Sequence, residues 1–172
     1  VLGKLAQEGQ KAVMEILNNP FIEPAMVPLE EDDIKTDLTD TAVFVIARSF
    51  GEGADRKLAP GQYLPFSEEL EAVRRVALAY ENTILVLNVG GIMDLKALRA
   101  IEGIDAILLM SQAGSYGGYA LADILTGRET PSGHLTASWP VNYEDSPCAD
   151  RFSYLDGDLD DAYYSEGIYV GY

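Results

Sequence analysis

The sequence predicts an α/β fold in which helices flank a mostly parallel sheet, an α/β sandwich. Three short apolar runs rich in β-branched residues have the composition of buried strands. Each run is followed by a stretch with helical spacing, so the order is strand, helix, strand, helix, strand, helix. That alternation favours right-handed crossovers between parallel strands. The 172 residues suit one domain, and we expect a single domain over residues 1–172.

The segment before the first strand has a weaker pattern. Residues 1–19 carry a broken apolar face typical of a helix, which Asn18-Asn19-Pro20 would end. Three prolines then indicate extended or irregular chain, and the acidic run at residues 30–33 predicts a solvated surface loop. We interpret residues 1–40 as a leading helix and linker without a preceding strand. Because the last residues also stop abruptly, we expect a domain that is incomplete at both ends.

The first predicted strand covers residues 41–48, which are nearly continuous in apolar residues, and we expect burial on both faces. The first predicted helix begins at Ser67, whose hydroxyl suits an N-cap. Glu68 and Glu69 would interact favourably with the helix dipole in its first turn. Apolar residues at helical spacing predict one buried stripe, made of Leu70, Val73, Val76, Ala77 and Tyr80.

The second and third predicted strands cover residues 83–89 and 106–111. Between them, Asp94 can cap a short helix that runs to Ile101. Both strands are short and apolar, as expected for the interior of a parallel sheet.

The chain after the third strand begins with a glycine-rich turn at residues 114–118, which leads into a helix with Gly127 as its C-cap. Residues 129–140 turn and then alternate, which predicts a short strand. Residues 141–172 read as a trailing loop segment, first polar and acidic and then aromatic and rich in glycine.

Charge and composition exclude several classes of function. The net charge of −16 argues against nucleic acid as a partner, because phosphate binding needs clustered Lys and Arg. A lone Cys148 forbids an internal disulfide and fits a reducing compartment, and with a single His it disfavours a zinc site. No apolar run is as long as a membrane span, and the first residues do not resemble a signal peptide. We expect a cytoplasmic protein with no metal, no cofactor and no membrane partner.

The loop Gly51-Glu52-Gly53-Ala54-Asp55-Arg56 directly follows the first predicted strand. A carboxylate between two glycines has a backbone free to approach a ligand closely, and ligands bind at the carboxyl ends of strands in open α/β sheets. Asp55 and Arg56 can orient this loop or hold polar groups of a substrate. On the local pattern alone, an ordinary glycine-rich turn with a solvated Glu52 is an equal alternative.

Two further motifs are incomplete. Gly51 and Gly53 could open a dinucleotide-binding fingerprint, but Arg56 stands where the third glycine belongs. Residues 156–160 have the alternating acids of a calcium loop, yet that loop needs a Gly and a Glu at the positions held by Asp161 and Gly167.

Four stretches together form a more specific pattern: SFGEGADR, ILVLNVGG, GSYGGYALADILTGRETPSGHLTASWP and YYSEGIYVGY. In this order, over about residues 41 to 172, they resemble the α/β-sandwich domain of family 3 glycoside hydrolases of the β-glucosidase type. The resemblance implies a retaining β-glycosidase whose nucleophilic Asp lies on a (β/α)8 barrel outside this chain. It implies Glu52 as the general acid/base, with Asp55 and Arg56 shaping the loop and contacting substrate. Ser115-Tyr116 departs from the family pattern, which has a Glu before the paired glycines.

The implied chemistry needs two carboxyl groups about 5–5.5 Å apart, one as nucleophile and one as acid and then base. The acid must start protonated, which requires a raised pKa. This chain would hold half of that pair, so we expect it to be inactive by itself. Its implied partners are a β-linked glucoside or related glycoside and the barrel domain of the same polypeptide.

Two other classes of function are alternatives. In a non-catalytic carbohydrate-binding or scaffold domain, Glu52 would only bind sugar hydroxyls. A flavodoxin-like or receiver-like domain would bind a nucleotide or phosphate, which the strong negative charge disfavours.

Overall fold

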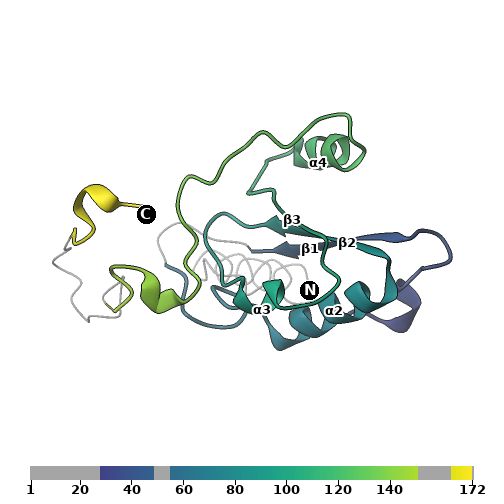
Figure 1. The fold of residues 1–172 in the computed structure, drawn as a ribbon, viewed down its shortest axis with the longest axis horizontal. Coiled ribbons are helices and arrows are strands. Elements are labelled where there is room, and N and C mark those ends of the chain that lie inside the picture. Colours follow the sequence, from purple (N-terminus) through teal and green to yellow (C-terminus); the bar gives the residue numbers. More distant parts are fainter. Residues whose placement is uncertain (1–27, 49–54, 151–163, 172) are drawn as a thin grey trace, which may run out of the picture.

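A computed structural model describes residues 28–48, 55–150 and 164–171 of the chain. A parallel sheet lies at their centre, with two helices on one side of the strands and a third on the other side (Figure 1). The α/β class is therefore confirmed. The predicted helix at residues 1–19, the loop residues 49–54 and the acidic residues 156–160 lie outside the described residues.

The described sheet has the order β1-β2-β3, and both pairings are parallel. Its strands are β1 (Thr41–Ala47), β2 (Asn82–Asn88) and β3 (Ala106–Leu109). Thr41 pairs with Asn82 at one end of β1 and Ala47 with Asn88 at the other, so these two strands begin and end together. All three predicted strands are confirmed, and the loops after β1 and β2 leave the sheet at the same edge.

Three α-helices and three short 3₁₀ turns are present in the described residues, and the shortest α-helix depends on packing for its stability. Their bounds are α2 (Ser67–Ala79), α3 (Lys96–Arg99) and α4 (Gly117–Leu125), and short 3₁₀ turns occur at η1 (Glu31–Asp33), η2 (Tyr143–Asp145) and η4 (Gly167–Tyr169). A helix as short as α3 is not stable alone, so its packing holds it in place. Leu98 of α3 is fully buried, which contributes about 1.5–3 kcal/mol.

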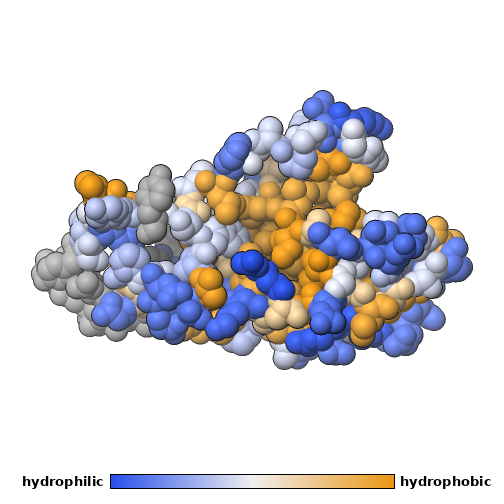
Figure 2. Space-filling view, in the orientation of Figure 1, coloured by the Kyte–Doolittle hydropathy of each residue, from blue (hydrophilic) through white to orange (hydrophobic). Residues whose placement is uncertain are grey.

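The core lies between the sheet and α2 with α3. Leu85 and Leu87 of β2 pack there against Val73 of α2, and all three side chains are at most 1% exposed. Trp139 is partly buried against the same cluster, which accords with the core role expected of a lone Trp. Apolar surface also gathers around the strands between α4 and the α2–α3 side (Figure 2).

The predicted burial of β1 on both faces is wrong. Ile46 is buried, but Val43 and Val45 on the opposite face are 42% and 49% exposed. Side chains alternate between the faces of a strand, and β1 packs against α2 through one face only. The β-branched residues of β1 therefore indicated a strand correctly, while its continuous apolar run gave no information on which face is covered.

The predicted N-cap of α2 also needs correction. Ser67 is the first helical residue, and its hydroxyl donates to the Glu68 carboxylate at 2.9 Å. The cap position belongs to Phe66, whose backbone N–H donates to Glu69 Oε2 at 2.9 Å. Glu69 thus satisfies the backbone donor of the cap residue, and the Ser67 hydroxyl does not act as the predicted cap.

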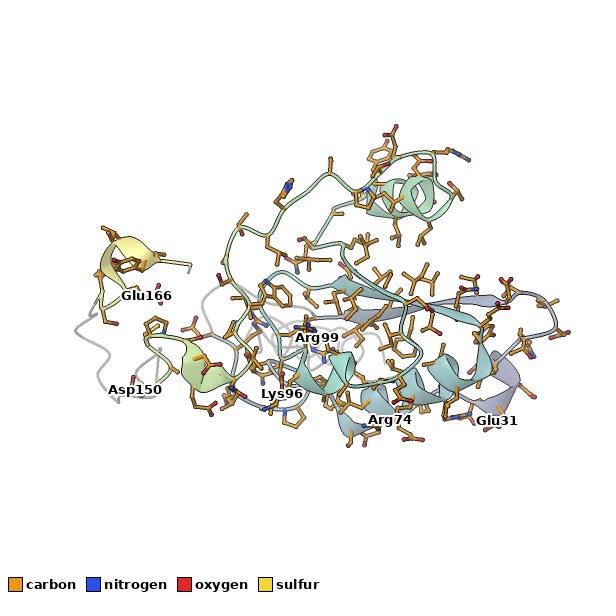
Figure 3. All side chains as sticks on the ribbon, in the orientation of Figure 1. Glu31, Arg74, Lys96, Arg99, Asp150 and Glu166 are labelled. Atoms are coloured by element: carbon orange, nitrogen blue, oxygen red, sulfur yellow. The ribbon has the colours of Figure 1, made fainter. Side chains whose placement is uncertain are left out.

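The buried stripe of α2 is confirmed at Val73, Val76 and Ala77. Leu70 is partly buried against the core, and Tyr80 lies just beyond the last helical residue. Charged side chains occupy the outer surface, where Arg74 lies on α2 and Lys96 on α3 (Figure 3).

The ends of the remaining helices follow the prediction in part. Asp94 Oδ1 accepts from the Lys96 backbone N–H at 2.8 Å, but the cap position of α3 belongs to Leu95, and α3 is shorter than predicted. Gly127 has φ +72°, the left-handed conformation that favours glycine after a helix. Residues 30–33 form an exposed 3₁₀ turn, and Arg75 donates to Glu31 at 2.7 Å.

The strand predicted within residues 129–140 does not form, although the structure describes all of these residues. Their backbone is irregular, and its link to the end of the chain is one bond from Ser138 N–H to the Gly171 carbonyl at 2.7 Å. Among the described residues, no neighbouring strand pairs with this alternating stretch. In the part of the chain described, no helix is long and apolar enough to cross a bilayer.

Candidate functional site

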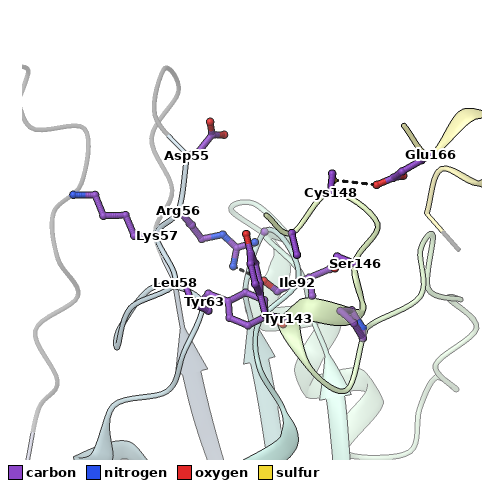
Figure 4. A pocket seen from close by; sticks show the side chains of 13 residues that line it. Asp55, Arg56, Lys57, Leu58, Tyr63, Ile92, Tyr143, Ser146, Cys148 and Glu166 are labelled. Atoms are coloured by element: carbon purple, nitrogen blue, oxygen red, sulfur yellow. Dashed lines mark hydrogen bonds between the residues drawn. The ribbon is translucent and has the colours of Figure 1, made fainter. Parts of the chain in front are cut away.

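The candidate site lies at the sheet edge where the loops after β1 and β2 emerge. Glu52 is outside the described residues, so its surroundings are defined by the residues before and after 49–54. Arg48 is the last described residue before positions 49–54, and Asp55 and Arg56 are the first described residues after them. Both Asp55 and Arg56 line a cavity of about 440 Å³ (Figure 4).

Four described segments line this cavity. One is the chain after the Glu52 loop, one follows β2, one covers Pro140 to Ala149, and the last contributes Glu166. The lining residues are Asp55, Arg56, Lys57, Leu58, Tyr63, Gly90, Ile92, Pro140, Tyr143, Ser146, Cys148, Ala149 and Glu166. The Lys57 side chain points away from the other labelled groups (Figure 4). The parallel pairing of β1 and β2 explains why the first two segments meet here.

Arg56 is fixed within this wall. Its Nη1 donates to the carbonyl of Ile92. Gly91 makes room for the guanidinium, because a Cβ built there would lie 2.7 Å from Arg56 Nη2. Burial lowers the pKa of Arg56 from its ordinary value, but a guanidinium stays cationic. The wall of the cavity therefore includes a permanently positive guanidinium, which a backbone carbonyl helps to hold in place.

Two tyrosines form the aromatic part of the cavity. The rings of Tyr63 and Tyr143 meet edge to face, with centroids 5.2 Å apart and planes at 75°. Burial raises the pKa of Tyr63, and the nearby Asp94 raises it further. Tyr63 is therefore a neutral hydroxyl at physiological pH. Apolar ring surface beside hydroxyl groups suits a ligand that is itself partly apolar and partly polar, such as a sugar.

Cys148 and Glu166 join two trailing segments of the chain. The Cys148 thiol donates to Glu166 Oε1 at 3.3 Å (Figure 4). These residues are 18 apart in the sequence, and no local pattern predicted their contact. Among the described residues, no group of His, Cys, Asp and Glu is arranged to hold a metal ion.

A buried ion pair lies at the carboxyl end of β1, directly before the Glu52 loop. Arg48 donates from Nη1 to Glu69 Oε1 at 2.7 Å and from Nη2 to Glu69 Oε2 at 2.6 Å. Arg48 is 3% exposed and Glu69 is 7% exposed. A charged residue at the end of an apolar strand is visible in the sequence, but no local pattern pairs Arg48 with Glu69.

Comparison with known proteins shows the family to which this chain belongs. The family profile described as "Glycosyl hydrolase family 3 C-terminal domain" matches residues 6–172, nearly the whole chain. The chain belongs to glycosyl hydrolase family 3. The resemblance inferred from the sequence motifs is thereby confirmed.

Two relatives of this family 3 domain are β-glucosidases by name. "Beta-glucosidase A" of Butyrivibrio fibrisolvens is 33% identical over 88% of this chain and 21% of its own length. "Beta-glucosidase" of Ruminococcus albus is 31% identical over 85% of this chain and 15% of its own length. β-Glucosidase 3B of Thermotoga neapolitana, solved in complex with glycerol, superposes with a TM-score of 0.75 at 31% identity, over 98% of this chain and 25% of that chain. The chain thus spans about a fifth of the length of the first relatives it matches.

Proposed function

We propose that this family 3 domain supplies the general acid/base of a retaining β-glycosidase, with Glu52 in that role. β-Linked glucosides or related glycosides would be the substrates, and the nucleophilic Asp would lie on a (β/α)8 barrel of the same, longer polypeptide. The observation that carries the proposal is the family match over residues 6–172. The β-glucosidase names of the relatives, and the small share of their length that this chain spans, support the substrate class and the second domain.

The position of the Glu52 loop suits this role. It follows β1 at the carboxyl edge of a parallel sheet, where loops can reach across to a pocket. Protonated Glu52 would donate its proton to the glycosidic oxygen while the nucleophile attacks the anomeric carbon. As a carboxylate, it would then remove a proton from the water that hydrolyses the glycosyl-enzyme.

Asp55 and Arg56 are proposed to contact the substrate beside Glu52. Both line the 440 Å³ cavity, and Arg56 is fixed there by the Ile92 carbonyl. A fixed guanidinium can donate to a sugar hydroxyl without losing much conformational freedom on binding. The Tyr63 and Tyr143 rings would supply the apolar wall against which a sugar ring or aglycone packs.

Leaving-group dependence tests the role of Glu52. In the complete enzyme, Glu52→Ala should slow hydrolysis of an aryl glucoside with a poor leaving group by about 10²–10⁴-fold. An activated aryl glucoside needs little protonation, so its glycosylation step should change far less. Steady-state kcat/KM for both substrates measures the difference.

The exposed Glu102 supplies the control, and Glu102→Ala should leave both rates unchanged. Equal, modest losses on both substrates for Glu52→Ala would instead make Glu52 a sugar-binding residue of a non-catalytic carbohydrate-binding or scaffold domain.

A further inference from the structure

We propose that the buried ion pair between Arg48 and Glu69 positions the loop that carries Glu52, and that both are therefore positioning residues for acid catalysis. The inference rests on the proposed function of Glu52. It concerns two described residues that neither the sequence motifs nor the family resemblance singled out.

The pair ties the start of the loop to two elements. The Arg48 backbone N–H donates to the Asn88 carbonyl at 3.1 Å, which fixes the main chain to the end of β2. Its guanidinium donates hydrogen bonds to both carboxylate oxygens of Glu69. It also donates from Nη1 to the Ala47 carbonyl at 2.8 Å. Glu69 in turn accepts from the Phe66 backbone N–H at 2.9 Å. Arg48 is thereby locked to the first turn of α2 as well as to β2.

The other end of the loop is held in a comparable way. Arg56 donates to the carbonyl of Ile92 in the segment after β2, and Gly91 leaves space for its guanidinium. The described chain on each side of positions 49–54 is therefore held by an arginine, Arg48 before these positions and Arg56 after them. Fixing both ends of so short a loop restricts the conformations open to it.

Stability alone does not account for this arrangement. A buried ion pair is often no more stable than well-packed apolar residues of similar volume, because both charges lose their hydration. Arg48 Nε also finds no hydrogen-bond partner among the described residues, which leaves a costly buried donor. The bidentate contact does, however, fix the direction of Arg48 in a way that an apolar side chain cannot. Positioning of the adjoining loop explains why a charged pair stands here.

An apolar replacement of the pair separates positioning from stability. We would measure the complete enzyme carrying Arg48→Met together with Glu69→Leu, which removes both charges and keeps similar volume. The unfolding temperature should fall only slightly, because replacing a buried ion pair is commonly neutral or stabilising while the Phe66 backbone N–H loses its Glu69 acceptor. The ratio of kcat/KM for the substrate with the poor leaving group to kcat/KM for the substrate with the good one should fall about 10–100-fold. A misplaced acid slows only the hydrolysis of the substrate whose leaving group must be protonated.

Two single variants sharpen the test. Arg48→Lys keeps the positive charge but loses the bidentate hydrogen bond to Glu69, so its kcat/KM ratio should lie between those of the wild type and the double variant. Glu71→Gln lies on the same helix but in an exposed pair with Arg74 at 3.6 Å, and it should leave the ratio unchanged. If the double variant does not fold, Glu69→Gln takes its place with the same expected fall in ratio.

Two results would overturn the positioning role. One is a folded variant with the wild-type ratio, and the other is an equal loss on both substrates together with a large fall in the unfolding temperature. Glu52→Ala measured alongside tells the two proposals apart. If Glu52→Ala changes the ratio and the pair variant does not, only the positioning role fails. If Glu52→Ala itself leaves the ratio unchanged, the proposed function fails.

Discussion

Glu69 performs two tasks with one carboxylate. It accepts from the Phe66 backbone N–H at the start of α2, and it neutralises the buried Arg48 through two short contacts. The sequence predicted the first task in outline, because acidic residues favour the first turn of a helix. It could not predict the second, since Arg48 is 21 residues away and meets Glu69 only when β1 packs against α2.

Tyr63 should contribute to the pH dependence of the free energy of unfolding. Its raised pKa means that the folded chain keeps the phenol protonated at pH values where the unfolded chain has ionised it. The stability linked to Tyr63 is therefore complete below about pH 10, the ordinary pKa of tyrosine, and is lost as the pH rises through the folded value. Tyr63→Phe should make the free energy of unfolding fall less steeply in that range.

Urea unfolding between about pH 8 and about pH 11 measures this effect. Tyr164, which is 91% exposed, supplies the control, and Tyr164→Phe should leave the pH dependence as it was. An identical alkaline decrease in the wild type and Tyr63→Phe would show that Tyr63 does not contribute to it.

The elements were predicted well wherever the local pattern was strong. β1, β2 and β3 carried runs of β-branched and apolar residues, and Gly127 has the backbone that a helix end requires. The errors arose where the outcome depends on a neighbour. Residues 129–140 alternate like a strand but pair with no strand in the described part of the chain, and β1 is covered by α2 on one face only.

Gly103 tests how the turn between α3 and β3 is built. Its φ is +89°, and a Cβ there would lie 2.7 Å from the carbonyl oxygen of Ala77 in α2. Gly103→Ala should therefore lower the free energy of unfolding by more than about 1 kcal/mol, measured by urea denaturation.

Gly118 is the matched control for that substitution. It lies in α4, its position is open, and Gly118→Ala should be neutral or stabilising by up to about 1 kcal/mol. Equal effects of the two substitutions would contradict the close packing of Gly103 against α2.

At the scale of the whole molecule, parallel topology brings the candidate site together. Because β1 and β2 end in register, the loop with Glu52 and the segment with Ile92 emerge side by side. The sequence located the Glu52 loop from its glycines and its place after a strand. It did not reveal the Tyr63–Tyr143 contact, whose members are far apart in the chain. The extent of the domain over residues 1–172, with 1–40 leading and 141–172 trailing, stays a prediction.

The isolated chain provides a prediction at this scale. It would carry the acid/base without the nucleophile, so the purified 172-residue chain should not hydrolyse an aryl glucoside. Circular dichroism establishes that the chain is folded, and the complete enzyme on the same substrate is the positive control. Turnover that co-purifies with the isolated chain would overturn the division of the catalytic pair between two domains.

Azide rescue of Glu52→Ala in the complete enzyme tests directly whether Glu52 is the general acid/base. Without its base, the variant should accumulate glycosyl-enzyme from an activated aryl glucoside, and azide needs no deprotonation to attack it. Azide should restore turnover, and the product should be the glycosyl azide with the β configuration retained. Failure of azide to accelerate turnover or to appear in the product would contradict the assignment of Glu52 as the general acid/base.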